Sequence, residues 1–533
     1  MKSKLAVAVL AAFAAIVAVL PVAAQGEWSA KADRIWDVTD PDPNVAYMRP
    51  IRAIVWDIEQ LGDRVYVGGR FLSVKSPRGE TFSRPYLAAF DLESGAWIDG
   101  FQPQLDGAVY AIDTTADGRL VVGGEMTGGV VKLDPISGAT VGGFTAGITK
   151  GGGKPGVTDI EVVGGDLYAG GSFSRAQGVW LGGLAKLDAA TGAIDRTWTP
   201  TADLDTVAPR GAGRLVFGLA VDPSRDRVYV AGKFGSISGN TDAAYFATLD
   251  TTTGAPRTDV PQGLPAGVLY HSHYSMWQHD VQWAGDKVFI GGQAHQTVIM
   301  NADDLRAEQS FYTNRGVGDR YSGGDTQVIH VGRNTVWSGC HCWGSVGEYP
   351  IGHNIADPEG RMTLSEFYSF ASEFGRTAPF GQQDVNGMYG VDLTTGQLVD
   401  VNFSVRGRAG AYAILEDTNG RVWFGGQFTG DPDGGHEIHG LFRSSPAPGV
   451  MGPTGLRSTM QTRERVVLTW DRYADAVSYE ISADGVVIGT KTNRWFTHRD
   501  LPAGTGRRYT VTAILPDGSR SPASNPVEVS TRP

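Results

Sequence analysis

Short runs of alternating apolar and polar residues recur along most of the chain, and several of them end in a pair of small residues. Val65-Tyr66-Val67 precedes Gly68-Gly69, and Val422-Trp423-Phe424 precedes Gly425-Gly426. An alternation with period two predicts strands. The first small residue of each copy lies at positions 68, 123, 170, 231, 291, 339 and 425. Spacings near 50 residues indicate a repeat architecture such as a propeller or a solenoid.

Each copy belongs to a longer unit of four expected strands. A strand such as 109–112 precedes it across a tight Asp117-Gly118 turn, and a strand such as 184–188 follows it before the Thr191-Gly192 turn. Asp-Gly is a strong hairpin signal because both turn residues need positive φ. Four antiparallel strands per unit form one propeller blade, and glycine pairs permit close backbone approach where blades crowd. We therefore expect an all-β fold with a seven-bladed propeller.

The two ends of the repeat region indicate a closed ring. Asp33-Arg34-Ile35-Trp36 resembles Asp195-Arg196-Thr197-Trp198, which is an expected fourth strand. The last unit shows a third strand at 440–443 and then stops. We predict that the N-terminal segment supplies the missing strand and removes an exposed sheet edge. An open solenoid is the alternative.

The pattern Val-Tyr-Val-Gly-Gly-x-Phe followed by Leu-Ala-x-Phe-Asp resembles kelch repeats, and most closely a kelch-like family of exported bacterial proteins. The resemblance covers residues 33–445 and implies a kelch-like β-propeller. It implies no particular activity, because such propellers serve in binding modules as well as in enzymes.

A separate domain is expected after a linker at 446–451. In residues 452–533, strands at 466–470 and 478–482 are followed by Tyr509. This segment resembles a fibronectin type III sandwich, in which the resemblance assigns Tyr509 to the tyrosine corner, with its hydroxyl bonded to nearby backbone. Such modules occur as spacers in exported bacterial polysaccharide-degrading enzymes. We expect a spacer or adhesive module.

Residues 1–24 resemble a secretory signal peptide, with Lys2 and Lys4, an apolar stretch over 5–20, and Val22-Ala23-Ala24 at the cleavage positions. A membrane anchor is the alternative reading. The formal net charge is −11 and no basic stripe is present, so a nucleic-acid partner is not expected. Charged residues make up only 19% and Gly reaches 73 residues, which excludes a long coiled coil. We expect a secreted monomer with no membrane span in the mature chain.

Histidines are concentrated in one part of the chain, because seven of the 10 lie between 271 and 353. The strand order places the loop before strand one and the loop after strand two on the same face of a propeller, so we expect these residues on one rim. Aromatic residues and a long insertion at about 343–385 accompany them. The expected ligand-binding residues are Tyr270, Tyr274, Trp277, His279, His295, Trp343 and Tyr349.

A metal site is one interpretation of this cluster, with His271, His273 and His341 as ligands and Zn, Cu or Ca as the ion, none of them favoured. Solvated or hydrogen-bonded histidines are the other. Cys340 and Cys342 are expected to form a disulfide, since an exported protein with an even cysteine count favours one. A thiolate metal pair or two free thiols are the alternatives.

Three aspartates recur at matching places in the first strand of different units. Asp57, Asp159 and Asp280 are each followed by Ile or Val. Recurrence favours a structural role, such as bonding neighbouring backbone.

Three functions remain open from the sequence. The first is an exported protein that binds a glycan or a cell-wall or cell-surface component on one rim. The second is a polysaccharide hydrolase or lyase, with or without a metal ion, for which paired carboxylates would be needed. The third is a structural scaffold for protein–protein interaction.

Overall fold

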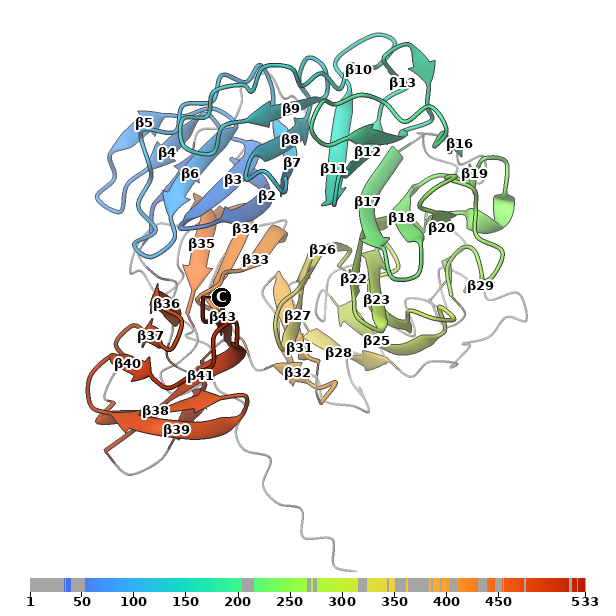
Figure 1. Cartoon of the computed structure of the whole chain (residues 1–533). Coiled ribbons are helices and arrows are strands. Elements are labelled where there is room, and N and C mark those ends of the chain that lie inside the picture. Colours follow the sequence, from blue (N-terminus) through green and yellow to red (C-terminus); the bar gives the residue numbers. More distant parts are fainter. Residues whose placement is uncertain are drawn as a thin grey trace, which may run out of the picture.

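A computed structural model describes residues 33, 35–39, 53–203, 215–265, 270–271, 276–314, 324–342, 345–349, 361–362, 383–384, 387–393, 395–399, 401, 410–429, 439–445, 453, 455–473, 476–516, 520–524 and 526–532. Antiparallel sheets arranged around a common axis form its larger part, a propeller-like ring (Figure 1). The chain is nearly all β; the one helical element in the described residues is a short 3₁₀ turn at Thr241–Ala243. The expected signal segment 1–24 and the linker 446–451 lie outside the described residues.

The ring is built from one recurring unit in which three successive strands pair in chain order. The innermost strands are β2 (Ile54–Leu61), β7 (Val109–Thr114), β11 (Gly156–Val163), β17 (Leu215–Asp222), β22 (Gln278–Ala284), β26 (Thr326–Val331) and β33 (Ala411–Glu416). The middle strands are β3 (Arg64–Arg70), β8 (Leu120–Gly124), β12 (Asp166–Ser172), β18 (Arg227–Lys233), β23 (Lys287–Gly292), β27 (Thr335–Cys340) and β34 (Val422–Thr429). The third strands are β6 (Leu87–Asp91), β9 (Val130–Leu133), β15 (Leu184–Asp188), β20 (Phe246–Asp250), β24 (Gln296–Asn301), β31 (Met388–Asp392) and β35 (His439–Ser444).

The fourth strand of a unit, next to the third, is formed less regularly. Full strands there are β25 (Ala307–Asn314) and β32 (Leu398–Val399), whereas single bridges such as Phe90↔Trp97 and Leu187↔Ile194 stand in their place elsewhere. Between the third strand and this position, an aspartate closes the turn: Asp91 Oδ1 accepts hydrogen bonds from the backbone N–H and the hydroxyl of Ser94. The Asp-x-x-Ser/Thr-Gly sequence therefore stabilises the turn through side-chain hydrogen bonds of its aspartate.

Short accessory sheets join the segment that enters a unit to the loop after a middle strand, which is that of the same unit in three cases and that of the following unit for β21 and β29. They are β1 (Asp37–Thr39) with β4 (Ser73–Lys75) and β5 (Thr81–Ser83); β10 (Ile148–Thr149) with β13 (Arg175–Ala176) and β14 (Val179–Trp180); β16 (Ala202–Asp203) with β19 (Ser236–Ile237); and β21 (Tyr270–His271) with β29 (Arg361–Met362).

The long insertion contributes strands to a neighbouring sheet. β28 (Ser345–Tyr349) pairs with β25, and β30 (Gln383–Asp384) pairs with β28, so the β22 sheet has six strands. The insertion was expected as a loop on the rim, but part of it instead extends a sheet because β25 offers a free edge to it.

Hydrophobic cores lie between adjacent sheets. One core combines Val55 and Ile58 of β2 with Ala413, Trp423 and Leu441 of the last sheet, and so closes the ring. Glycine pairs make this packing possible: a Cβ on Gly425 would lie 2.3 Å from Val55 Cγ1 of the next sheet. The expected role of the pair in close approach is confirmed.

The N-terminal segment lies beside β35, but residues 33 and 35–36 do not form the strand predicted there, and β1 pairs with β4 instead. The backbone N–H of Asp33 donates to the carbonyl of Arg443 over 2.8 Å, and Arg443 Nε donates to Asp33 Oδ2 over 2.7 Å. Arg443 is 7% exposed and its guanidinium also donates to the carbonyls of Leu92 and Glu93 in the first unit. One arginine thus ties both ends of the ring together.

The C-terminal part is two sheets around one core. The first contains β36 (Arg457–Gln461), β37 (Val466–Thr469) and β40 (Trp495–His498); the second contains β38 (Ser478–Ala483), β39 (Val486–Lys491), β41 (Gly506–Ile514), β42 (Arg520–Ala523) and β43 (Val527–Ser530). Trp470 is in the core, as expected.

The role expected for Tyr509 differs in the structure. Its hydroxyl contacts His498 Nδ1 at 2.9 Å rather than backbone. The hydroxyl that accepts a backbone N–H is that of Tyr479, from Tyr473 at 3.1 Å. Tyr509 lies on β41 and His498 on β40 of the other sheet, so this contact connects the two sheets.

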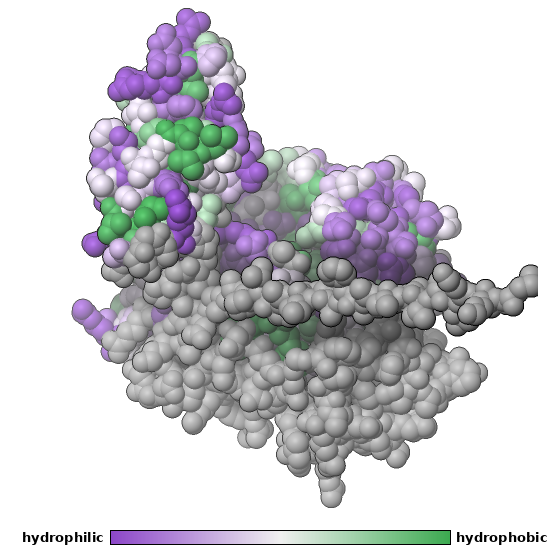
Figure 2. All heavy atoms as spheres, turned by 90° about the horizontal axis from the view of Figure 1, so that it is seen from below, coloured by the Kyte–Doolittle hydropathy of each residue, from purple (hydrophilic) through white to green (hydrophobic). Residues whose placement is uncertain are grey.

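Hydrophilic residues cover most of the coloured surface in Figure 2, and hydrophobic ones form small patches there. Among the described residues, no helix has the length and apolar character needed to cross a membrane.

Candidate functional site

The innermost strands of the ring surround its axis (Figure 1). Each of them contributes residues to the wall of a cavity of about 700 Å³. Its lining combines aromatic side chains, carboxylates and two lysines. A concave site with aromatic and convergent polar groups is the usual form of a ligand pocket.

Each innermost strand carries a β-bulge near its start, because its register to the middle strand shifts by one residue there. A bulge leaves one extra residue unpaired and changes where its side chain points. All of the bulged residues line the cavity, and we call them the bulge ring: Trp56, Tyr110, Thr158, Phe217, His279, Gln327 and Tyr412.

Ring-to-ring contacts hold the bulge ring together across sheet boundaries. Trp56 lies between Tyr412 and Tyr110, with centroid separations of 4.6 and 5.9 Å. Phe217 and His279 meet edge to face at 5.3 Å. These contacts pre-organise an aromatic border around the cavity, and such geometry is favourable for aromatic pairs.

Polar groups anchor Tyr110 at this border. Its hydroxyl contacts Glu125 Oε2 at 3.0 Å, and Arg70 forms an ion pair with the same carboxylate at 2.6 Å. Burial raises the pKa of Tyr110 to about 12, so the phenol is protonated at neutral pH.

Each of the three recurring aspartates connects its own inner strand to the next sheet of the ring. Asp57 accepts from the N–H of Ile112, Asp159 from that of Leu219, and Asp280 from that of Ile329, over 2.5–2.6 Å. The structural role expected for these three residues is confirmed. Asp113, two positions further along its strand, makes the same type of bond to Val162.

Between β26 and β33, an imidazole takes the place of the aspartate as the acceptor of the backbone N–H. His330 Nε2 accepts from the N–H of Glu416 over 2.9 Å, so this nitrogen carries no proton. Burial lowers the pKa of His330 to about 4, which keeps the ring neutral and the bond intact.

Six carboxyl groups of the cavity wall have pKa values above their ordinary range. Burial raises the pKa of Asp57 and Asp280 to about 7, against the opposing effect of their backbone hydrogen bonds. Burial also raises the pKa of Glu161 to about 8, with the negative charges of Asp113 and Asp280 adding to the effect. The pKa values of Glu59, Asp113 and Asp159 are raised for the same main reason. Perturbed carboxyls in a cleft are typical of functional sites, although structural networks also produce them.

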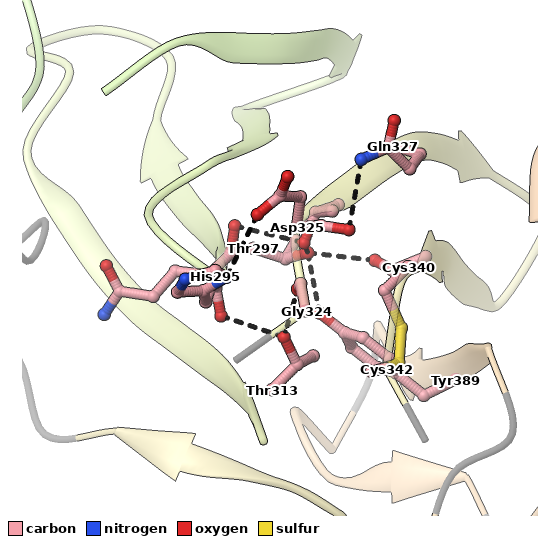
Figure 3. The surroundings of a disulfide bond; sticks show 12 residues. His295, Thr297, Thr313, Gly324, Asp325, Gln327, Cys340, Cys342 and Tyr389 are labelled. Atoms are coloured by element: carbon pink, nitrogen blue, oxygen red, sulfur yellow. Dashed lines mark hydrogen bonds and ion pairs between the residues drawn. A yellow bond between two sulfur atoms is a disulfide. The ribbon is translucent and has the colours of Figure 1, made fainter. Parts of the chain in front are cut away.

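Three of the clustered histidines act on one carboxylate beside the cavity, that of Asp325, which Figure 3 shows next to His295. His295 Nδ1 lies 3.2 Å from Asp325 Oδ1. Burial raises the pKa of Asp325, but the hydrogen bond from His295 and the charges of His295, His279 and His341 outweigh it and hold the pKa well below its usual range. The predicted convergence of histidines therefore holds for these three residues.

His341 connects this cluster to the bulge ring. Its Nε2 lies 2.9 Å from the hydroxyl of Tyr412, and its backbone N–H donates to the carbonyl of Asp325. In the structure Cys340 and Cys342 are joined by a disulfide on either side of His341 (Figure 3). Both cysteines are fully buried, so the bridge holds the end of β27 in place.

Other predicted site residues have different surroundings. Trp277 is half-buried in a core cluster, and the ammonium of Lys233 lies 3.6 Å from its ring centroid. Tyr270 and His271 form β21, and Tyr349 ends β28, but the side chains of these three lie outside the described residues, as do Tyr274, His273 and Trp343 entirely.

Within the part of the chain that the structure describes, no group of three or more His, Cys, Asp or Glu side chains has the spacing to hold a metal ion. Two of the three predicted metal ligands, His271 and His273, are not described at the level of side chains.

Sequence reasoning missed most of the cavity wall. Trp56, Tyr110, Phe217 and Tyr412 occupy the bulge, and Glu59 and Glu161 lie three positions after it. The available signal was the position directly before the recurring aspartate, which is aromatic or imidazole in two of the three copies that have the aspartate.

Comparisons with known proteins give limited similarity. No family model matches the chain. It is 27% identical over 226 residues to the poly(3-hydroxybutyrate) depolymerase of Ralstonia pickettii, over 37% of this chain and 44% of that protein. The chain thus spans less than half the length of that relative.

Solved structures with some likeness include two that extend over most of the ring. The WD40 β-propeller domain of Doa1 gives a TM-score of 0.40 at 10% identity, over 78% of this chain and 97% of that one. The computationally designed Ika8 protein gives 0.37 at 11% identity, over 78% and 99%. A family 28 exopolygalacturonase of Yersinia enterocolitica gives 0.14 at 23% identity, over 15% and 20%. These scores are low, so the description of the architecture depends on the sheet topology itself.

Proposed function

We propose that the chain is an exported binding protein that takes a glycan or a related cell-surface polymer at the bulge ring of the central cavity. In this proposal the ring of sheets is a seven-bladed kelch-like propeller, and residues 452–533 form a fibronectin type III spacer. The observation that carries it is the aromatic border formed by Trp56, Tyr110, Phe217 and Tyr412 above a polar cavity.

The chemistry of this border suits sugars. Aromatic rings present flat apolar faces for the C–H faces of a pyranose, while carboxylates and phenols accept and donate hydrogen bonds to its hydroxyls. The cavity of about 700 Å³ has room for part of an oligosaccharide.

A screen of soluble oligosaccharides and cell-wall polymers, followed by calorimetry, tests the proposal. Trp56→Ala should weaken binding at least tenfold, whereas Trp180→Ala should not, because Trp180 is 49% exposed on β14 and does not line the cavity. Binding of no polymer in the screen, or equal affinity of the two variants, would overturn it.

Hydrolysis of a polymer is the second candidate, favoured by the raised pKa of Glu161, which would hold a proton for a leaving group at neutral pH. The partial similarity to a poly(3-hydroxybutyrate) depolymerase adds that polyester to the substrates to be tried. No Gly-x-Ser-x-Gly motif is present in the sequence, so an α/β-hydrolase nucleophile elbow is not available. Release of soluble fragments that stops in Glu161→Gln would favour this candidate; a purely structural scaffold would neither bind nor cleave.

A further inference from the structure

Most of the acidic side chains of the cavity wall form no ion pair with a cationic side chain among the described residues. Seven carboxylates line it, and six of them lie on the innermost strands: Asp57, Glu59, Asp113, Asp159, Glu161 and Asp280. Among the described residues, none of the six forms an ion pair with a lysine or arginine.

Neither of the two lysines of the lining pairs with one of these six carboxyls. Lys150 Nζ donates to the Ser172 hydroxyl over 2.7 Å, and Lys154 Nζ pairs with Asp106 Oδ2 at 3.1 Å. The lining carboxylate with a cation is Glu125, which pairs with Arg70 at the border. The deeper wall therefore keeps an excess of carboxyl groups, and buried charges without partners are costly.

These carboxyls are concentrated on one side of the cavity. Three positions after the bulge, β2, β7 and β11 carry Glu59, Asp113 and Glu161. At the same register, the other inner strands carry Ala220, Gln282, His330 and Leu415. His330 is neutral, as its hydrogen bond from Glu416 requires. The wall thus has an acidic side, where β2, β7 and β11 carry five of the six carboxyls, and another side on which Asp280 of β22 is the sixth.

Not every carboxyl on the acidic side accepts a hydrogen bond from the described part of the protein. Asp57, Asp113 and Asp159 each accept a backbone N–H from the neighbouring sheet. Glu161 receives no hydrogen bond within the described residues, and the nearby charges of Asp113 and Asp280 repel its ionised form. Its carboxyl is therefore available to a ligand.

We propose that the acidic side of the cavity, with Glu161 at its centre and Trp56 and Tyr110 at its border, binds the ammonium group of an organic cation. This inference rests on the proposed function and specifies its ligand: a glycan with free amino groups. A bare metal ion fits less well, because the described carboxyls do not converge to metal-ligand spacing and the cavity is much larger than an ion. Aromatic rings beside carboxylates are a favourable environment for ammonium groups.

Binding of such a ligand should release protons. In the empty cavity, mutual repulsion and burial keep part of the carboxyls protonated near neutral pH. An ammonium group favours the ionised form of a neighbouring carboxyl and lowers its pKa. The proton leaves the carboxyl for the buffer, so the observed enthalpy depends on the ionisation enthalpy of that buffer.

Calorimetry with a glucosamine tetramer and with its fully N-acetylated counterpart tests the inference, with spermidine as a cation that is not a sugar. We expect the amine tetramer to bind at least tenfold more tightly than the acetylated one, with proton release. Glu161→Gln should remove most of that preference, and Glu80→Gln, an exposed carboxylate of an outer turn, should leave it unchanged. Thermal melts establish that both variants are folded.

The outcomes separate the inference from the proposed function. Equal affinity for both tetramers overturns the cation inference and leaves glycan binding in place. Binding of spermidine, but of neither tetramer, with loss in Glu161→Gln supports the cation site and overturns the glycan. Binding of none of the three overturns the inference.

Discussion

The carboxylate of Asp159 in β11 joins two sheets: its Oδ1 accepts the N–H of Ile160 at 2.8 Å and its Oδ2 accepts the N–H of Leu219 in β17 at 2.5 Å. Both oxygens are thus used by main-chain donors, one within the sheet and one across the boundary. Asp57 makes the same two types of hydrogen bond, to Ile58 in its own strand and to Ile112 in the next sheet, so this connection between sheets recurs in the ring.

Asp159→Asn tests the device. An amide has only one acceptor oxygen, so its NH₂ would face a backbone N–H and leave that donor unsatisfied. We expect a loss of about 1–3 kcal/mol in the free energy of unfolding. Urea unfolding measures it, with Asp63→Asn in an exposed turn as the matched control; equal midpoints for the two variants would contradict the prediction.

Stability should depend on pH through the cavity carboxyls. The folded pKa of Glu161 is about 8, above the ordinary value near 4, so the folded state holds a proton that the unfolded state releases. Its contribution to stability is therefore present below the unfolded pKa and is lost as pH rises through about 8. His330 acts in the opposite direction below about pH 6.5, because its pKa of about 4 makes the unfolded state the better proton acceptor there.

Glu161→Gln removes the first of these effects. We expect the variant to be more stable than the parent at pH 8, by on the order of 1 kcal/mol, and the difference to shrink toward pH 6. Thermal melts between pH 6 and 9 measure it. A constant difference across that range would show that Glu161 does not titrate in the folded protein.

Glycine pairs should tolerate no side chain at their first position. A Cβ on Gly123 would lie 2.6 Å from Ile160 Cδ1 and 2.9 Å from Val157 Cγ1 of the next sheet. Gly123→Ala should cost about 1–3 kcal/mol, as overpacking usually does. Gly165→Ala is the control, since a Cβ there meets nothing within 4 Å; a melting temperature lowered equally by both would refute the packing explanation.

Ring closure should depend on Arg443. Arg443→Met keeps an unbranched side chain but removes the guanidinium, which lies over the Trp423 ring and bonds to Asp33, Leu92 and Glu93. We expect a loss of about 3–5 kcal/mol, because a partly buried carboxylate and two carbonyls lose their donor. Denaturant unfolding measures the loss, and hydrogen exchange should show it concentrated in β35 and β2. Exchange raised evenly over all sheets would argue against a closure role.

The sequence by itself determined the local features of this protein. Period-two alternation identified the strands, the small pairs marked where sheets approach, and recurrence of Asp57, Asp159 and Asp280 indicated their structural role. These inferences succeed because strand periodicity and steric room are properties of a few neighbouring residues. The resemblance of Asp33-Arg34-Ile35-Trp36 to a later segment extended the same logic to ring closure.

Only the tertiary structure decided which side chains form the cavity wall. A β-bulge is a property of the register between two strands, so its effect on Trp56 or Tyr412 cannot be seen in either strand alone. Likewise, the raised pKa of Glu161 arises from burial and from Asp113 and Asp280, which belong to other sheets. These groups come close together only because the sheets surround one axis, and their spacing along the chain does not predict it.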